Sequence, residues 1–212
     1  MSTRLTDVTI TTARLISFSD GVFAIAVTLL VFNLKVPAIP VADAHRLLPG
    51  LISAMIPHFV TYILTFLLVA VYWVFHHRVL NMVTHIDSPF IWMNIWYLLS
   101  ISFIPFPSAL IAAYPREISS FIFYVSSMIS VGIISMIMVG YAAYNRRLIG
   151  KDMPLAIVKY YFFRQSTSFF VFLTAIPLAF YELRWAQYYL FVTFPLHWIT
   201  RKYFRKQAKA GD

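Results

Sequence analysis

Long apolar runs alternate with short polar segments along the chain, and this pattern predicts helices that cross a membrane. A hydrocarbon core about 30 Å thick takes an α-helix of about 20 apolar residues, a length that most of the runs reach. We expect six membrane spans, at residues 14–36, 50–75, 89–113, 117–144, 155–180 and 184–200. The predicted fold is therefore a single all-α membrane domain over residues 1–212, ending in a short basic tail at residues 201–212.

The first run, residues 14–36, has two unlike faces. Steps of three and four positions place a bulky apolar stripe on one face, made of Val22, Ile25, Leu29, Phe32 and Val36, with Thr28 beside it. Asp20 lies about 140° around the helix from Ile25, so the two side chains point in different directions. Because an acid in a membrane helix normally faces protein or water, we expect Asp20 to brace this helix against a neighbour rather than to contact an ion.

The partners of this acid are expected on other spans. Arg14 lies about 120° from Asp20 on the same helix, so a tight pair within the helix is not expected, and each should reach a neighbouring span or subunit. Candidate bracing partners are His76, His77 and Asn94. Adjacent histidines diverge by about 100° on a helix. The chain has no cysteine, and no carboxylate pair completes a ligand set, so we expect no metal site.

Composition and charge support a membrane protein. The chain is 60% hydrophobic and 12% charged, a balance outside the range of soluble domains. Its net charge of +9 would suggest nucleic acid as the partner of a soluble protein. Here the basic residues lie between the apolar runs and at the C-terminus, where they indicate membrane topology instead.

The basic residues fall mainly on one side of the predicted membrane. Of the 17 Lys and Arg residues, only Lys35, Arg46, Arg116 and Arg184 lie on the side of the first, third and fifth loops. The other 13, which is 17 minus 4, lie on the side of both termini. Since positive residues stay in the cytoplasm, we expect both termini to be cytoplasmic.

The sequence contains neither a complete potassium-channel filter motif nor a catalytic motif. Val139, Gly140 and Tyr141 are similar to part of the filter of ordinary potassium channels, but Met138 and Ala142 stand where that filter has threonine and glycine. No re-entrant loop accompanies them. The sequence also lacks the G-x-S-x-G and H-E-x-x-H motifs and a pair of catalytic carboxylates, so we do not expect an enzyme.

Motifs in the first three runs resemble a known family. R-x-x-x-F-S-D, formed by Arg14, Phe18, Ser19 and Asp20, precedes GVFAIAVTLLVFNLKVP. W-x-x-H-H-R and D-x-x-x-x-x-x-N follow, ahead of S-x-x-P-F-P. Together these motifs resemble the prokaryotic members of the transmembrane protein 175 family of potassium channels.

The resemblance implies an architecture and a set of pore residues. Members of the family have six helices per repeat, lack the usual filter loop and line the pore with the first helix. Animal relatives carry two repeats per chain, so the single motif here implies a homotetramer. The pore constriction, five residues after the motif's aspartate, falls on Ile25. Leu29 and Phe32 would continue the apolar lining, with Phe32 bulkier than the usual aliphatic residue, and Thr28 would form a polar layer.

We therefore expect a potassium-selective cation channel in the plasma membrane of a prokaryote, gated by apolar side chains of the first helix. Its expected partners are other copies of the chain, membrane lipid, K⁺ and other monovalent cations, with no cofactor and no nucleic acid. Two alternatives stay open: a secondary transporter coupled to protons through Asp20 and the histidines, and a non-conducting membrane scaffold. Unitary currents would indicate a channel, saturable exchange a carrier, and absence of flux a scaffold.

Overall fold

The computed structural model describes residues 11–150 and 153–210, and this part of the chain is helical apart from loops and one β-bridge, between Val83 and Ile149. The α-helices are α1 (Thr12–Leu29), α2 (Ala44–Ala54), α3 (Ile56–Met82), α4 (Ser88–Phe103), α5 (Pro105–Ala113), α6 (Ile118–Ala143), α7 (Leu155–Tyr181), α8 (Leu183–Tyr189) and α9 (Thr193–Ala210). Short 3₁₀ turns are η1 (Leu30–Asn33), η2 (Val41–Asp43), η3 (Tyr144–Arg146) and η4 (Leu190–Val192).

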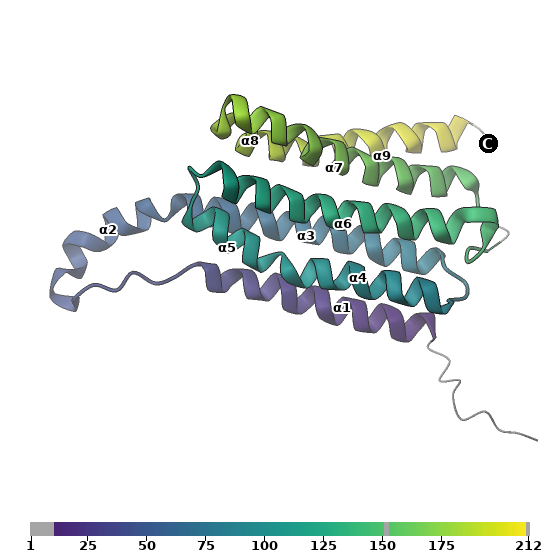
Figure 1. Ribbon diagram of the computed structural model, residues 1–212, viewed down its shortest axis with the longest axis horizontal. Helices are drawn as coiled ribbons and strands as arrows, with labels where there is room; N and C mark the ends of the chain where they lie inside the picture. Colours follow the sequence, from purple (N-terminus) through teal and green to yellow (C-terminus); the bar gives the residue numbers. More distant parts are fainter. Residues whose placement is uncertain (1–10, 151–152, 211–212) are drawn as a thin grey trace, which may run out of the picture.

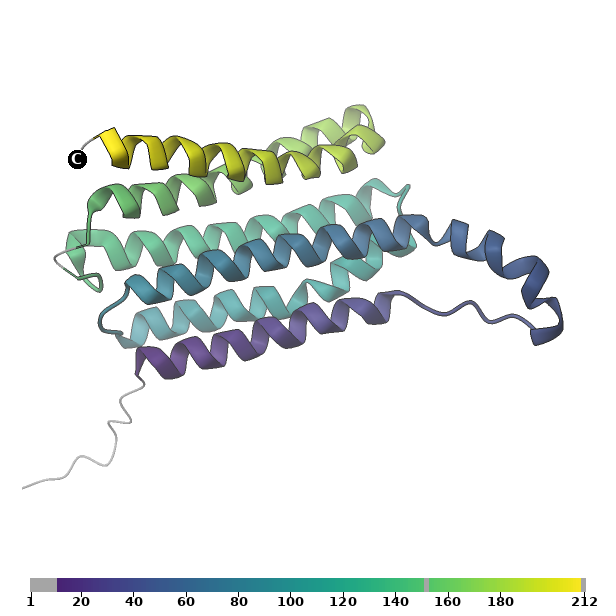
Figure 2. The ribbon, with the colours of Figure 1, turned by 180° about the vertical axis from the view of Figure 1, so that it is seen from behind.

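The long helices lie side by side in an elongated bundle (Figure 1). α1 packs on α3 and α4 at one edge, α6 packs between α4 and α7, and α9 packs on α7 at the opposite edge. The start of α1 and the end of α9 lie at the same end of the bundle, while α2 projects beyond the other end (Figure 2). The bundle therefore leaves one side of α1 at its margin.

Four helical segments are long and apolar enough to cross a membrane by length and composition: Thr12–Asn33, Ile56–Met82, Ser88–Ala113 and Ile118–Arg146. The chain is thus an all-α, multi-pass membrane protein. α7 and α9 also run along the bundle (Figure 1) but do not reach the same apolarity, since α7 contains Lys159 and Arg164 and the last turns of α9 are basic. The six-span count stays a prediction.

The structure sets helix boundaries that differ from the predicted spans. The first helical segment ends at Asn33 rather than at residue 36, because Leu34 already leaves the helical conformation, with φ −92° and ψ 87°. The second predicted span, 50–75, corresponds to α3, which begins at Ile56 and ends at Met82. α3 starts as a separate helix because Pro57, at its first turn, has no N–H to continue the hydrogen bonds of α2.

Hydrogen bonds between buried hydroxyl groups join α3 to α5 and α6. The Thr65 hydroxyl lies 3.0 Å from the Tyr124 hydroxyl, and Ser108 Oγ donates to Thr65 Oγ1 at 3.2 Å. The Tyr72 hydroxyl donates to the Met128 carbonyl at 3.1 Å. Since lipid tails offer no hydrogen-bond partners, such bonds help hold membrane helices in register. They join α3, which packs against α1, to α5 and α6.

Candidate functional site

α1 contacts its own chain through one face only. The buried residues are Leu15, Ser19, Phe23 and Ala26. On the other side, Ile25 is 62% exposed and Phe32 73% exposed, with Leu29 also exposed between them. Of the predicted apolar stripe, only Val22 is half-buried. A continuous apolar surface therefore lies open along α1, and no described part of the chain covers it.

Thr28 lies on the same open side of α1. Its hydroxyl donates to the backbone carbonyl of Ile25 at 2.9 Å. Because the hydroxyl proton is used in this bond, the lone pairs of the oxygen stay available as acceptors. Thr28 is therefore able to present an oxygen to a cation on the open side.

Asp20 points towards α3 and away from the open stripe. Its Oδ1 accepts a hydrogen bond from Trp73 Nε1 at 2.8 Å. His77 Nδ1 lies 3.7 Å from the same oxygen, beyond hydrogen-bond distance, and forms an ion pair only when the imidazole is protonated. The carboxylate thus links α1 to one turn of α3, and a cavity of about 340 Å³ that also includes Phe66 and Ala70 adjoins it.

The neighbouring Ser19 links α1 to α4. Asn94 Nδ2 donates to Ser19 Oγ at 3.2 Å, and the Ser19 hydroxyl donates to the Leu15 carbonyl at 2.8 Å. His76 occupies the core beside this pair, where its ring stacks on Tyr97 at a centroid distance of 4.4 Å and an interplanar angle of 14°. Its environment is an aromatic core rather than the open side of α1.

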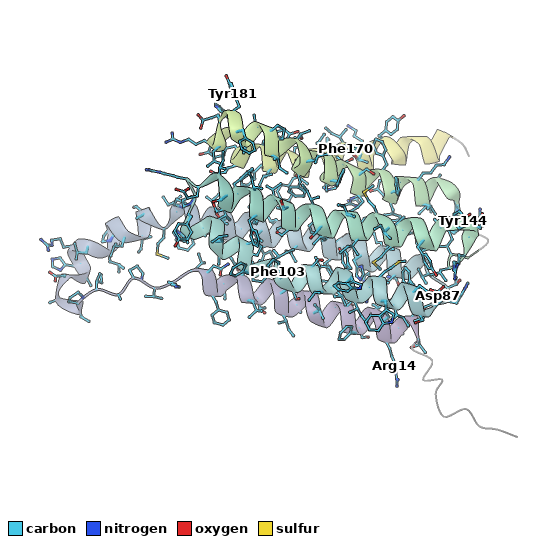
Figure 3. The ribbon with its side chains drawn as sticks, in the orientation of Figure 1. Arg14, Asp87, Phe103, Tyr144, Phe170 and Tyr181 are labelled. Atoms are coloured by element: carbon cyan, nitrogen blue, oxygen red, sulfur yellow. The ribbon has the colours of Figure 1, made fainter. Side chains whose placement is uncertain are left out.

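Arg14 and Phe18, the other members of the sequence motif, lie on the open side. Phe18 is 58% exposed. Arg14 projects from α1 away from the bundle (Figure 3), and its guanidinium makes no ion pair with the residues that the structure describes. The motif is therefore divided between two faces of the helix, with Ser19 and Asp20 turned inward and Arg14 and Phe18 turned outward.

The structure brings together some predicted residues and separates others. The Asp20 carboxylate lies 3.7 Å from His77 Nδ1, and Asn94 donates a hydrogen bond to Ser19. His76, in contrast, stacks on Tyr97 away from the carboxylate. The direct hydrogen-bond donor to Asp20 is Trp73, which the predicted set of bracing residues does not contain. Its position one helical turn before His77 was the available signal, because residues four apart share a helix face.

A second polar cluster, also absent from the predicted set, joins α4 to the end of α6. Asp87 Oδ2 accepts hydrogen bonds from the Tyr141 hydroxyl at 2.7 Å and from Arg147 Nε at 3.1 Å, and Asp87 Oδ1 accepts from the Phe90 backbone N–H. Partial burial raises the pKa of Asp87, but the bonds from Tyr141, Phe90 and Arg147 outweigh it and hold the pKa below its usual value. The D-S-P sequence at Asp87 is a helix-start signal.

A third polar contact lies near the other end of α1, where the chain between α4 and α5 is broken by prolines. Pro105 and Pro107 supply no backbone N–H groups, so the helix is interrupted at Ile104. Asn33 Nδ2, in η1, donates to the Pro105 carbonyl at 3.4 Å. This bond ties the end of the first helical segment to the break.

The chain is similar to several proteins that are named as channels. Residues 14–105 match the family model described as endosomal/lysosomal potassium channel TMEM175. A protein of Chamaesiphon minutus named as a potassium channel is 41% identical over 103 residues, which is 49% of this chain and 50% of that protein. One of Streptomyces collinus, also named as a potassium channel, is 38% identical over 104 residues, covering 49% of each chain. This chain thus spans about half the length of these relatives.

Two further matches extend the comparison. The human protein named endosomal/lysosomal proton channel TMEM175 is 26% identical over 141 residues, which is 66% of this chain and 27% of that protein. The crystal structure of a lysosomal potassium-selective channel TMEM175 homologue from Chamaesiphon minutus superposes with a TM-score of 0.75 at 28% identity. It covers 91% of this chain and 97% of that one. The sequence match over residues 14–105 and the structural match both show that the chain is similar to the TMEM175 family.

Proposed function

We propose that this protein is a potassium-selective cation channel in which four copies of α1 surround the pore. The observation that carries the proposal is the open apolar side of α1, with Ile25 and Phe32 exposed on a helix whose opposite face is packed on its own chain. The names of the bacterial relatives and of the structural neighbour support potassium as the permeant ion. Passive ion conduction requires neither catalytic residues nor a cofactor.

The proposed constriction is a ring of Ile25 side chains, continued by Leu29 and Phe32. A narrow apolar ring cannot replace the hydration shell of an ion, so it closes the pore by steric contact and dewetting. Thr28 lies beside this ring and supplies an oxygen acceptor. Selectivity in this scheme comes from pore width and the Thr28 layer, so some sodium permeation accompanies that of potassium.

The proposed assembly is a homotetramer in the plasma membrane of a prokaryote, with both termini in the cytoplasm. The common position of the start of α1 and the end of α9 at one end of the bundle supports an even number of crossings (Figure 2). The excess of basic residues at that end supports its cytoplasmic location. Arg14, which projects from the bundle, is available in this arrangement to a neighbouring subunit (Figure 3).

Protons are the second candidate permeant ion, because the animal relatives are named as proton channels. Asp20 on α1 and His77 on α3, with 39% and 40% of the side chains exposed, are two ionisable groups on facing helices. Reversal potentials measured under opposed potassium and pH gradients distinguish the two ions. Potassium conduction requires the reversal potential to follow the potassium gradient.

The Ile25→Ala variant tests the constriction in planar bilayers. We expect a wider ring and a unitary potassium conductance raised by about twofold or more, because four large side chains are shortened at the narrowest point. The matched control is Ile199→Ala, the same substitution at a 54% exposed position on α9, at the opposite edge of the bundle. Equal conductance in Ile25→Ala and the unmodified protein would reject this ring as the constriction, and absence of unitary currents from the unmodified protein would reject the channel.

A further inference from the structure

A cavity of about 350 Å³ opens between α3, α5, α6 and α8, at the end of the bundle opposite to the start of α1 and the end of α9. Its wall is apolar and includes Ile56, Val60, Leu64 and Phe191. Leu64 is buried at 7% exposure, while Arg116 and Arg184 are exposed members of the lining. The cavity therefore combines an apolar wall with two cationic groups nearer its opening.

A hydrogen bond brings the two arginines to the same cavity. Gln187 Nε2 donates to the Pro115 carbonyl at 2.6 Å, which ties α8 to the segment just before Arg116. Arg184 lies three positions before Gln187 on α8, and residues at this spacing share a helix face. Both guanidinium groups therefore border one opening, although they come from segments far apart in the sequence.

Neither arginine is neutralised within the described part of the chain. The ion pairs found there involve Arg46, His77 and Arg147 instead. Glu182, the acid nearest to Arg184 in sequence, uses Oε1 to accept the backbone N–H of Arg184 at 3.3 Å, where it caps α8. Two positive charges thus face a partly apolar cavity without a bound counter-charge from a carboxylate.

We propose that this cavity binds one anionic phospholipid, with its phosphate between Arg116 and Arg184 and an acyl chain along Val60 and Phe191. The location suits a lipid because α3 begins at Ile56, α5 ends at Ala113 and α6 begins at Ile118, so the opening lies where apolar helices meet the headgroup region. Arginine binds phosphate with several directed N–H groups, and the apolar wall continues towards the hydrocarbon. This site is independent of the pore.

Native mass spectrometry of the purified, delipidated full chain tests the site by titration with phosphatidylglycerol and with zwitterionic phosphatidylcholine. We expect tighter binding of phosphatidylglycerol, and an affinity lowered about tenfold or more in Arg116→Gln/Arg184→Gln, since each cation near a membrane surface adds about 1 kcal/mol of attraction to anionic lipid. The matched control is Lys35→Gln/Arg46→Gln, which removes the same charge at the same end of the bundle and leaves the affinity unchanged. Each single variant, Arg116→Gln or Arg184→Gln, is expected to bind phosphatidylglycerol with an affinity about fivefold lower. The single variants keep the test decisive if the double variant does not fold.

Two further measurements separate a lipid from a free phosphate. Val60→Trp fills the apolar wall while keeping both arginines, and we expect it to weaken phosphatidylglycerol binding. Inorganic phosphate at millimolar concentration should not displace the lipid. The proposal is overturned if the arginine variants bind phosphatidylglycerol as the unmodified protein does, if the control loses affinity equally, or if inorganic phosphate displaces the lipid.

Discussion

The orientation of Asp20 shows how far single residues can be placed from sequence. Its angle from Ile25 follows from helix geometry alone, and the structure places the carboxylate against α3 and Ile25 on the open side. Helix geometry did not identify the hydrogen-bond donor to Asp20, which is Trp73. Whether Trp73 or His76 faces the carboxylate depends on the rotation of α3 about its own axis, which the nearly uniform apolarity of α3 leaves undetermined.

The Trp73→Phe variant tests the hydrogen bond to Asp20. Phenylalanine keeps an apolar ring but removes the indole N–H, so the carboxylate loses its 2.8 Å donor. We expect a loss of stability of about 1.5–3 kcal/mol, as for other hydrogen bonds to charged groups, measured by thermal unfolding in detergent. Trp185→Phe is the control, because Trp185 is 66% exposed on α8 and far from α1. An equal loss in both variants would show that the bond contributes nothing specific.

At the scale of elements, the sequence predicted where apolar helices occur better than where they begin and end. Prolines explain two of the differences: Pro57 starts α3 as a separate helix, and Pro105 divides the third predicted span into α4 and α5. The contact between the α3–α4 loop and the segment after α6 could not be predicted, because it joins residues distant in sequence. It comprises the Val83–Ile149 bridge, the hydrogen bond from the Thr84 N–H to the Leu148 carbonyl, and the Asp87 cluster.

The Asp87→Asn variant tests the charge of this cluster. Asparagine can still cap α4, so the change removes mainly the interactions of the carboxylate with Arg147 and Tyr141. We expect the free energy of unfolding to fall by about 1 kcal/mol at neutral pH. The value is small because the Arg147 side chain is 53% exposed, so that solvent screens its ion pair.

The pH dependence of this loss follows from the sign of the pKa shift. The pKa of Asp87 is lower in the folded protein than its ordinary value of 3.8, so its contribution is full above that pH and disappears as the pH falls through the lower folded value. The stability difference between the unmodified protein and Asp87→Asn should therefore be constant from pH 7 to about pH 5 and shrink below about pH 4. A difference that grows on acidification would contradict this assignment.

At the scale of the whole molecule, the alternation of charge along the sequence predicted which ends of the helices lie together. Arg116 and Arg184 occupy one end of the bundle, and Arg14 and Arg147 lie near the other. The pairing of Arg116 with Arg184 around one cavity was beyond the reach of the sequence, since it depends on how α8 docks beside α5 and α6.

Cysteine cross-linking tests the proposed assembly, and the chain offers a clean background because it contains no cysteine. In Ile25→Cys, copies of α1 that meet around an axis bring thiols close enough for disulfides, which need Cα atoms within about 7 Å. We expect oxidation to give covalent dimers on denaturing gels. Ile199→Cys, on α9 at the far edge, should stay monomeric, and native mass spectrometry should show four chains per particle. Monomeric Ile25→Cys after oxidation would contradict a pore lined by α1.

In the proposed tetramer, the one-sided packing of α1 would make channel activity depend on the concentration of protein in the membrane. Lipid tails are as apolar as isoleucine and phenylalanine, so covering this side of α1 in a bilayer releases little hydrophobic free energy, and close van der Waals packing must supply the cohesion. Association of that kind obeys mass action within the plane of the membrane. For a four-chain channel, diluting the protein with extra lipid would lower the conducting fraction more steeply than the protein-to-lipid ratio itself.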